Sequence, residues 1–128
     1  MRLLLDTCTF LWLATDAPQL SALARGHFVD PANAVFLSSV SAWEIALKHR
    51  LGRLPLPDPP DQLIPRLREE HGIAPLVLDE AAALTESRLP PLHRDPFDRM
   101  LVCQAIAEGL IIVTPDAAIR QYPVRTMW

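Results

Sequence analysis

The chain has 128 residues and a formal net charge of −3 at pH 7; half of its residues are hydrophobic and 21% are charged. This balance excludes a disordered chain and suits one domain, residues 1–128, that buries a proper core. The acidic charge excludes a protein that holds nucleic acid through a broad positive surface. Any such contact must therefore be local, through a basic patch or a bound metal ion.

The apolar runs are too short to cross a membrane; Leu110–Val113, one of the longest, falls far short of a bilayer span. The leucines at the N-terminus resemble a signal peptide, but Asp6 interrupts them too early and no cleavage site of small residues follows. We therefore expect a cytoplasmic protein without membrane contacts. The two cysteines, Cys8 and Cys103, lack the spacing of a zinc site and are expected to be reduced, mostly buried thiols.

The first predicted element is a buried strand, Arg2–Leu5, whose three leucines are apolar on both faces of a sheet and which stops at Asp6. A short helix or turn over residues 8–14 follows. Ser21 is placed to cap a helix that runs to about Val29. A second strand is predicted over residues 34–38.

The next predicted helix covers Ser41–Leu51. Ser41 and Glu44 have the spacing of a capping box, which puts Glu44 in the first turn, and Gly52 ends the helix. A stiff, proline-rich connector over residues 54–60 leads to an exposed, charged helix over residues 61–71, with Pro65 disturbing its first turn. A third strand is predicted over residues 73–78.

Asp79 is placed to cap a helix over residues 80–88. Asp95 and Pro96 suit the N-cap and first position of a helix that runs to Glu108, with Asp98 in its first turn. A buried strand over residues 110–113, Asp116, a short helix over residues 117–121 and an edge strand over residues 124–127 complete the chain. Such alternation with short connections predicts an α/β/α sandwich of three layers around a mostly parallel central sheet.

Three acids of this arrangement are expected to meet. The carboxyl ends of parallel strands, and the starts of the helices that follow them, lie at one edge of the sheet. Asp6 and Asp116 follow strands, and Glu44 lies near the start of the helix after the second strand, so the rule places them together. The rule does not place Asp98, because its helix precedes the fourth strand.

Several carboxylates in one pocket repel each other unless some are protonated or a cation lies between them. Oxygen ligands without His or Cys favour Mg²⁺ or Mn²⁺ over zinc. A metal ion of this kind suits phosphodiester hydrolysis, because it activates water and neutralises phosphate charge without a protein nucleophile.

Each acid also has a purely structural interpretation. Asp95 and Asp116 suit helix caps, and Glu44 and Asp98 suit the positive end of a helix, an effect of about 0.3–1 kcal/mol each. Asp6 is hardest to explain in this way, because it directly extends a buried strand and a lone buried carboxylate is unfavourable.

Neighbouring polar residues have two possible roles. Some could orient the acids, although turn or capping roles suit them equally; these are Thr7, Ser39 and Thr114. Basic residues could contact RNA phosphates, although a solvated surface position is the simpler interpretation of each; these are Lys48, Arg50, Arg53, Arg94 and Arg99.

Motifs in a fixed order along essentially the whole chain resemble those of one family. They are Leu3–Thr7, Ser41–Lys48, His93–Leu101, Val113–Asp116 and the C-terminal Tyr122–Trp128. In this order they resemble the PIN-domain ribonucleases, and specifically the VapC toxins of bacterial and archaeal toxin–antitoxin pairs.

The resemblance implies a compact α/β/α sandwich and a Mg²⁺-dependent endoribonuclease that cleaves single-stranded RNA. It implies an acidic site of Asp6, Glu44, Asp98 and Asp116, and so brings Asp98 to the edge that holds the other three. Asp95 matches a motif position of this subgroup and is a possible further ligand. A VapB-like antitoxin that blocks the site, and a homodimer, are also implied.

Other functions fit the sequence less well. A phosphatase of the haloacid dehalogenase type needs a second Asp two positions after the first, where this chain has Cys8, and a phosphorelay receiver needs adjacent acids near Asp6. Dinucleotide, P-loop and nucleophile-elbow glycine motifs are absent. The non-enzymatic alternative is a degenerate PIN domain that only binds RNA or protein.

Overall fold

The computed structural model describes residues 1–128 and contains one parallel five-stranded sheet. Its strands lie in the order β3-β2-β1-β4-β5, with β1 in the centre. All four pairings are parallel. The strands are β1 (Arg2–Leu5), β2 (Ala34–Ser38), β3 (Ala74–Leu76), β4 (Ile111–Val113) and β5 (Thr126–Met127).

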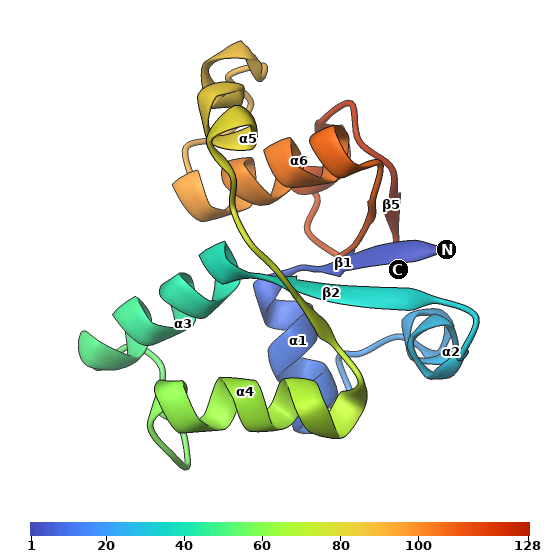
Figure 1. The fold of residues 1–128 in the computed structure, drawn as a ribbon, viewed down its shortest axis with the longest axis vertical. Coiled ribbons are helices and arrows are strands. Elements are labelled where there is room, and N and C mark those ends of the chain that lie inside the picture. Colours follow the sequence, from blue (N-terminus) through green and yellow to red (C-terminus); the bar gives the residue numbers. More distant parts are fainter.

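Helices cover both faces of this sheet (Figure 1), which confirms the predicted three-layer α/β/α architecture. One face carries α1 (Thr7–Ala14), α2 (Ala22–Val29) and α4 (Pro60–His71). The other carries α5 (Glu80–Leu84), α6 (Pro96–Glu108) and the 3₁₀ turns η1 (Glu86–Arg88) and η2 (Ile119–Gln121). The remaining helix, α3 (Ser39–Arg50), continues from the carboxyl end of β2 and contacts both α4 and α6. None of the helices has the length and apolar character needed to cross a bilayer.

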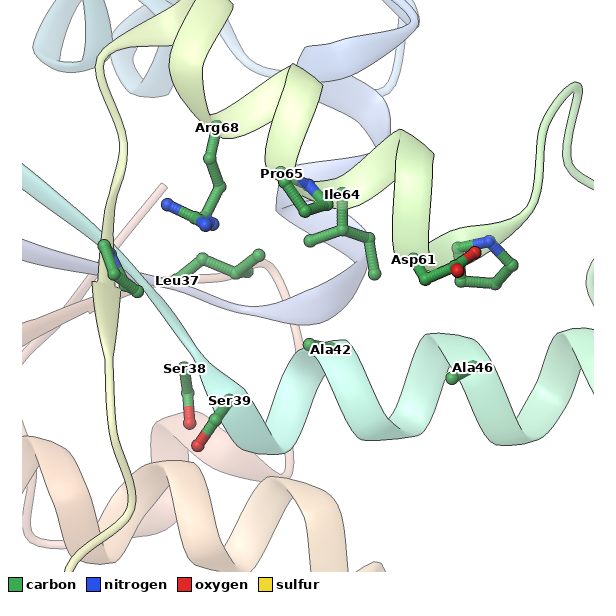
Figure 2. A pocket seen from close by; sticks show the side chains of 11 residues that line it. Leu37, Ser38, Ser39, Ala42, Ala46, Asp61, Ile64, Pro65 and Arg68 are labelled. Carbon is green, nitrogen blue, oxygen red and sulfur yellow. The ribbon is translucent and has the colours of Figure 1, made fainter.

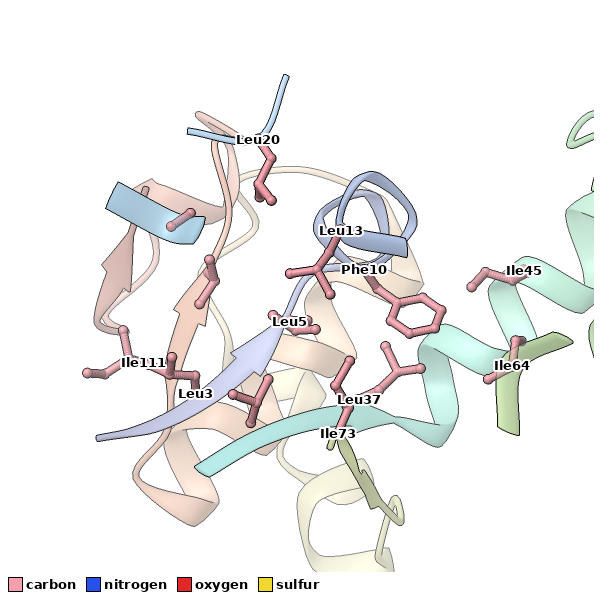
Figure 3. Packing of buried hydrophobic residues seen from close by; sticks show 13 residues of the cluster. Leu3, Leu5, Phe10, Leu13, Leu20, Leu37, Ile45, Ile64, Ile73 and Ile111 are labelled. Carbon is pink, nitrogen blue, oxygen red and sulfur yellow. The ribbon is translucent and has the colours of Figure 1, made fainter. Parts of the chain in front are cut away.

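The alternation of side chains along β1 divides the core in two. Leu3 and Leu5 face a cluster that includes Phe10 of α1 (Figure 3), whereas Leu4 faces a second cluster that includes Leu101 of α6. Each leucine is at most 1% exposed. Burial of a side chain of this size contributes about 1.5–3 kcal/mol to folding, so these residues fix β1, and with it Asp6, in the middle of the molecule.

The start of α3 differs from the sequence prediction. Ser38, the last residue of β2, is the N-cap, and its Oγ accepts a hydrogen bond from the Val40 N–H at 3.0 Å. Ser41 lies inside the helix and is fully buried, so the predicted capping box of Ser41 and Glu44 is wrong. Strand and helix join without a loop, which moves Glu44 from the first turn of the helix into the second.

The other differences concern the lengths of elements. The helix predicted over residues 80–88 is divided into α5 and η1, and the one over residues 117–121 is the 3₁₀ turn η2. β3 and β5 are shorter than predicted. α4 starts at Pro60 and continues through Pro65, and it is not wholly exposed, because Leu63 and Ile64 are buried.

Candidate metal centre

Asp6 lies at the junction of β1 and α1 and is only 4% exposed. Its side chain caps α1 by accepting the Thr7 N–H at 2.7 Å, and Thr114 Oγ1, which follows β4, donates to Asp6 Oδ2 at 2.7 Å. The thiol of Cys8 lies 3.5 Å from Oδ2. Burial raises the pKa of Asp6, although these hydrogen bonds act in the opposite direction. The two threonines therefore hold a carboxylate where its charge is unfavourable.

Glu44 reaches the same region from the second turn of α3. Thr7 Oγ1 donates to Glu44 Oε1 at 2.7 Å and lies 2.9 Å from Ser41 Oγ. Lys48, one turn further along α3, forms an ion pair with Glu44 Oε2. Burial lowers the pKa of Lys48, but the bond to Glu44 and the charges of Glu44, Asp95 and Asp98 outweigh it and raise this pKa. Glu44 thus has a partner on each of its oxygens.

Asp116 lies beside Asp6 through a shared hydroxyl group. Its backbone N–H donates to Thr114 Oγ1 at 3.0 Å, the same oxygen that donates to Asp6. The Asp116 carboxylate accepts the N–H groups of Ala118 and Ile119 at 2.7 and 3.3 Å, so it also caps the turn before η2, as one of its sequence interpretations proposed. Thr114 therefore connects the acids at the ends of β1 and β4.

Asp95 and Asp98 approach from the start of α6. Asp95 is the N-cap, as predicted, and accepts the N–H groups of Phe97 and Asp98 at 2.9 and 3.2 Å. The imidazole Nε2 of His93 lies 3.3 Å from Asp98 Oδ2. Burial, followed by the charges of Asp6, Asp95, Asp116 and Glu44, raises the pKa of Asp98 to about 8. The four other carboxylates are thus close enough to oppose its ionisation.

All five acids line one cavity of about 390 Å³ at the carboxyl edge of the sheet. Two cationic side chains, Lys48 and Arg53, also line it. The lining residues are Asp6, Thr7, Cys8, Leu11, Glu44, Ile45, Lys48, Arg53, Leu54, Asp95, Asp98 and Asp116. The structure therefore brings together the four acids that the sequence singled out, and Asp95 with them.

A second cavity, of about 310 Å³, lies between α3 and α4 (Figure 2). Leu37, Ala42 and Ile64 contribute to its largely apolar lining, and Asp61 is its one acid. Because it lacks converging carboxylates, it does not resemble a site for a metal ion. The cavity at the sheet edge is the better candidate for the functional site.

The polar and basic residues predicted to assist the acids have different roles in the structure. Thr7 and Thr114 contact the acids, whereas Ser39 Oγ accepts the Leu78 N–H at 3.1 Å and has a structural role. Arg53 lines the acidic cavity. Arg99 is only 9% exposed and donates to Glu86 Oε1 at 2.6 Å, so both interpretations of this residue, contact with RNA phosphates and a solvated surface position, are wrong.

Sequence reasoning did not single out two residues beside this site, His93 and Tyr122. Tyr122 is 3% exposed, and its hydroxyl lies 2.7 Å from His93 Nδ1. His93 stands five positions before Asp98, within the motif that carries Asp95 and Asp98. Nothing in the sequence pattern connects Tyr122 with His93, because they are brought together only by the path of the chain after β4.

The cavity suits a hard divalent cation in charge and donor chemistry. Its five carboxylates face only two cationic side chains, and burial together with the repulsion of the other four acids raises the pKa of Asp98. No three His, Cys, Asp or Glu side chains stand in a ready-made arrangement for a metal ion. Each of the five carboxylates accepts at least one hydrogen bond from within the chain.

Comparison with known proteins defines the class. The PIN domain family model matches residues 3–124, and the chain belongs to this family. Among its relatives, it is 30% identical over 132 residues to Ribonuclease VapC22 of Mycobacterium tuberculosis, covering 98% of this chain and 97% of that protein. It is 41% identical over 68 residues to Ribonuclease VapC16 of the same organism, covering 50% of this chain and 48% of that protein. The resemblance to the VapC proteins is thereby confirmed.

Solved structures confirm the fold. The structure of VapBC2 from Rickettsia felis, bound to a DNA fragment from its promoter, matches with a TM-score of 0.74 and 13% identity, covering 99% of this chain and 98% of that chain. DNA-bound VapBC from Salmonella typhimurium matches with a TM-score of 0.69 and 17% identity, covering 99% and 97%. The same backbone arrangement therefore occurs at low sequence identity.

Proposed function

We propose that this protein is a Mg²⁺-dependent endoribonuclease that hydrolyses phosphodiester bonds in single-stranded RNA. The observation that carries the proposal is the convergence of Asp6, Glu44, Asp98 and Asp116 on one cavity, in a chain related to proteins named ribonucleases. The excess of carboxylates is unfavourable for a folded chain by itself, and a divalent cation removes the conflict.

The four acids would hold Mg²⁺, or Mn²⁺ in its place, directly or through water. The bound ion would activate a water molecule and neutralise the charge of the phosphate that is attacked. Asp6 is the central ligand, because it is the most deeply placed acid and is oriented by Thr114 and the Thr7 N–H. Asp95 is already committed as the cap of α6 and contributes mainly its charge.

Two cations give the cavity a way to contact RNA despite its acidity. Arg53 lines the cavity without an ion pair to any acid, so its guanidinium is available to a phosphate. Lys48 is held by Glu44 and orients that carboxylate. This local pair of cations suits a protein whose net charge is −3, because contact with RNA is then confined to the site.

We also propose a protein partner, a VapB-like antitoxin that blocks the site, and a homodimeric state. Support for the partner comes from structural neighbours that are VapBC assemblies. Inhibition of RNA cleavage by the purified antitoxin would support the first proposal, and undiminished cleavage in the complex would contradict it. Light scattering on the isolated chain tests the second, with a monomer as the contradicting result.

The decisive experiment compares Asp6→Asn with Asp61→Asn. Asp61 is an exposed acid that lines the apolar cavity, so its variant controls for the loss of one negative charge. We expect wild type and Asp61→Asn to cleave single-stranded RNA with Mg²⁺ and to lose cleavage in EDTA, and Asp6→Asn to be inactive. Cleavage by Asp6→Asn, or cleavage that withstands the chelator, would reject the proposal.

Calorimetry with Mn²⁺ separates the enzyme from its non-enzymatic alternative. A nuclease with this site takes up the ion, and Asp6→Asn weakens the uptake. A degenerate PIN domain that only binds RNA or protein should show no uptake that depends on Asp6.

A further inference from the structure

A continuous series of hydrogen bonds leads from the molecular surface to Asp98. Arg99 Nε donates to Glu86 Oε1 at 2.6 Å, and Arg99 Nη1 donates to the Tyr122 hydroxyl oxygen at 2.9 Å. That hydroxyl lies 2.7 Å from His93 Nδ1, and His93 Nε2 lies 3.3 Å from Asp98 Oδ2. The participants come from η1, α6, the segment after η2 and the loop before α6.

The direction of these bonds follows from the chemistry of their ends. A guanidinium only donates hydrogen bonds, so the Tyr122 oxygen is an acceptor toward Arg99. The phenolic hydrogen remains, and His93 Nδ1 is the acceptor within its reach. Nδ1 therefore carries no hydrogen, and the neutral imidazole must carry its single hydrogen on Nε2, which faces Asp98.

The surroundings hold this geometry in place. The side chains of His93 and Asp98 are 18% and 13% exposed. The rings of His93 and Tyr122 pack with their centroids 5.3 Å apart, and the Arg99 guanidinium lies 5.8 Å from the centre of the Tyr122 ring. The imidazole is thus packed on one side and hydrogen-bonded on both nitrogens, so its orientation is well determined.

The two carboxylate oxygens of Asp98 therefore have different surroundings. Oδ2 accepts from His93, whereas Oδ1 has no hydrogen bond within the chain. No buried polar side-chain atom of the protein lacks a partner, so Oδ1 must reach solvent. This oxygen is the one that the carboxylate can offer to an ion in the cavity.

We propose that His93 is a positioning residue that holds Asp98 for metal binding, and that Tyr122 and Arg99 select the Nε2–H tautomer that this requires. The role in metal binding rests on the proposed function, whereas the tautomer does not. A group that fixes a metal ligand in this way typically changes metal affinity by about 10- to 100-fold when it is removed.

The tautomer is tested first, in the metal-free protein. The chain has four histidines, so the ¹⁵N signals of the imidazole of His93 can be assigned by comparison with a His93→Gln spectrum. We expect the Nε2–H pattern for His93 in wild type, and a mixture of both tautomers in Tyr122→Phe, which removes the hydroxyl donor. A wild-type spectrum of the Nδ1–H form would overturn the inference, whether or not the protein cleaves RNA.

Two substitutions of His93 then test its effect on metal binding. His93→Gln keeps an amide N–H near the position of Nε2, facing Asp98, whereas His93→Asn keeps an amide near Nδ1 and loses the donor to Asp98. In calorimetry with Mn²⁺ we expect His93→Gln to bind within about threefold of wild type and His93→Asn to bind at least about tenfold more weakly. The Mn²⁺ affinity of Tyr122→Phe should lie between those of the two His93 variants.

The outcomes separate the two proposals. Equal Mn²⁺ affinities for the Gln and Asn variants, with wild-type circular dichroism spectra, would overturn the positioning role. If His93→Asn does not fold, equal affinity of Tyr122→Phe and wild type would overturn it instead. Uptake of Mn²⁺ that is unchanged in Asp6→Asn would reject the proposed metal centre but leave the tautomer prediction intact.

Discussion

The Thr114 hydroxyl links Asp6 and Asp116 by hydrogen bonds. Its side chain is completely buried, donates to Asp6 Oδ2 and accepts the Asp116 N–H. One hydroxyl group thus bonds to the carboxylate that follows β1 and to the backbone N–H of the acid that follows β4.

Replacing Thr114 with the isosteric valine should therefore destabilise the protein. The change leaves the Asp116 N–H without its partner and Asp6 Oδ2 with only the Cys8 thiol, which costs about 1–3 kcal/mol of unfolding free energy. Urea denaturation measures this change in unfolding free energy. Thr15→Val is the matched control, because the Thr15 hydroxyl bonds to the Leu11 carbonyl at an exposed position and its loss should change stability by less than about 0.5 kcal/mol. Equal effects of the two substitutions would contradict the role given to Thr114.

Asp98 makes the stability of the metal-free protein depend on pH. Its pKa is about 8 in the folded protein, against 3.8 for an unperturbed group. Between these values the folded state keeps a proton that the unfolded chain has released. The stabilisation that this proton gives is complete below pH 3.8 and is lost as the pH rises through 8.

We therefore expect the unfolding free energy of the metal-free protein to fall between pH 5 and pH 8, and Asp98→Asn to reduce this fall. A difference in pKa of even one unit corresponds to about 1.4 kcal/mol, so denaturation in EDTA at both pH values resolves the effect. Asp30→Asn, at an exposed position, should retain the wild-type slope. A wild-type slope in Asp98→Asn would contradict the high pKa.

At the scale of elements, the position of α6 is fixed by the residues at its two ends. Asp95 and Pro96 start it, which sets Asp98 in the first turn, and Gly109 ends it with φ 66°. That left-handed conformation turns the chain directly into β4, so the helix that carries Asp98 and the strand before Asp116 are joined by two residues. The distance between Asp98 and Asp116 therefore depends on this short connection.

Gly109→Ala should destabilise the protein by about 1 kcal/mol. An added Cβ would meet no atom within 4 Å, so the effect comes from the backbone conformation alone. Gly26→Ala is the matched control, because Gly26 lies inside α2, its Cβ would also meet nothing, and alanine is favoured in a helix by about 0.5–1 kcal/mol. Thermal unfolding should show changes of opposite sign; a stabilising effect of Gly109→Ala would contradict the account.

At the scale of the whole molecule, the acidic cavity makes folding and ion binding interdependent. The acids come from positions 6 to 116 and meet only when the sheet has formed. An ion that binds the folded state stabilises it, by about 2.7 kcal/mol when its concentration is 100 times its dissociation constant. The unfolded chain separates the acids and cannot provide this site.

Saturating Mn²⁺ should therefore raise the unfolding temperature of wild type and of Asp61→Asn, and leave that of Asp6→Asn nearly unchanged. Differential scanning fluorimetry at several Mn²⁺ concentrations measures the shift. An equal shift in all three proteins would indicate ion binding elsewhere and would contradict a site at the carboxyl edge of the sheet.

The sequence alone was sufficient for the order of strands and helices and for the acids at strand ends. Apolar runs such as Leu3–Leu5 define strands because both faces are covered, and Asp95, Pro96 and Gly109 define the limits of α6 by local backbone chemistry. Local signals failed where two elements join without a loop, as at Ser38, because a strand residue there also serves as the helix cap.

Only the tertiary structure decided which hydrogen bonds form between side chains of distant segments. The edge rule for parallel sheets could not place Asp98, whose helix precedes its strand, and no spacing connects His93 with Tyr122 or Thr114 with Asp6. Hydrogen bonds of this kind depend on distances between segments that are far apart in sequence. They form when burial of the core brings the segments together, and so they cannot be derived from local residue patterns.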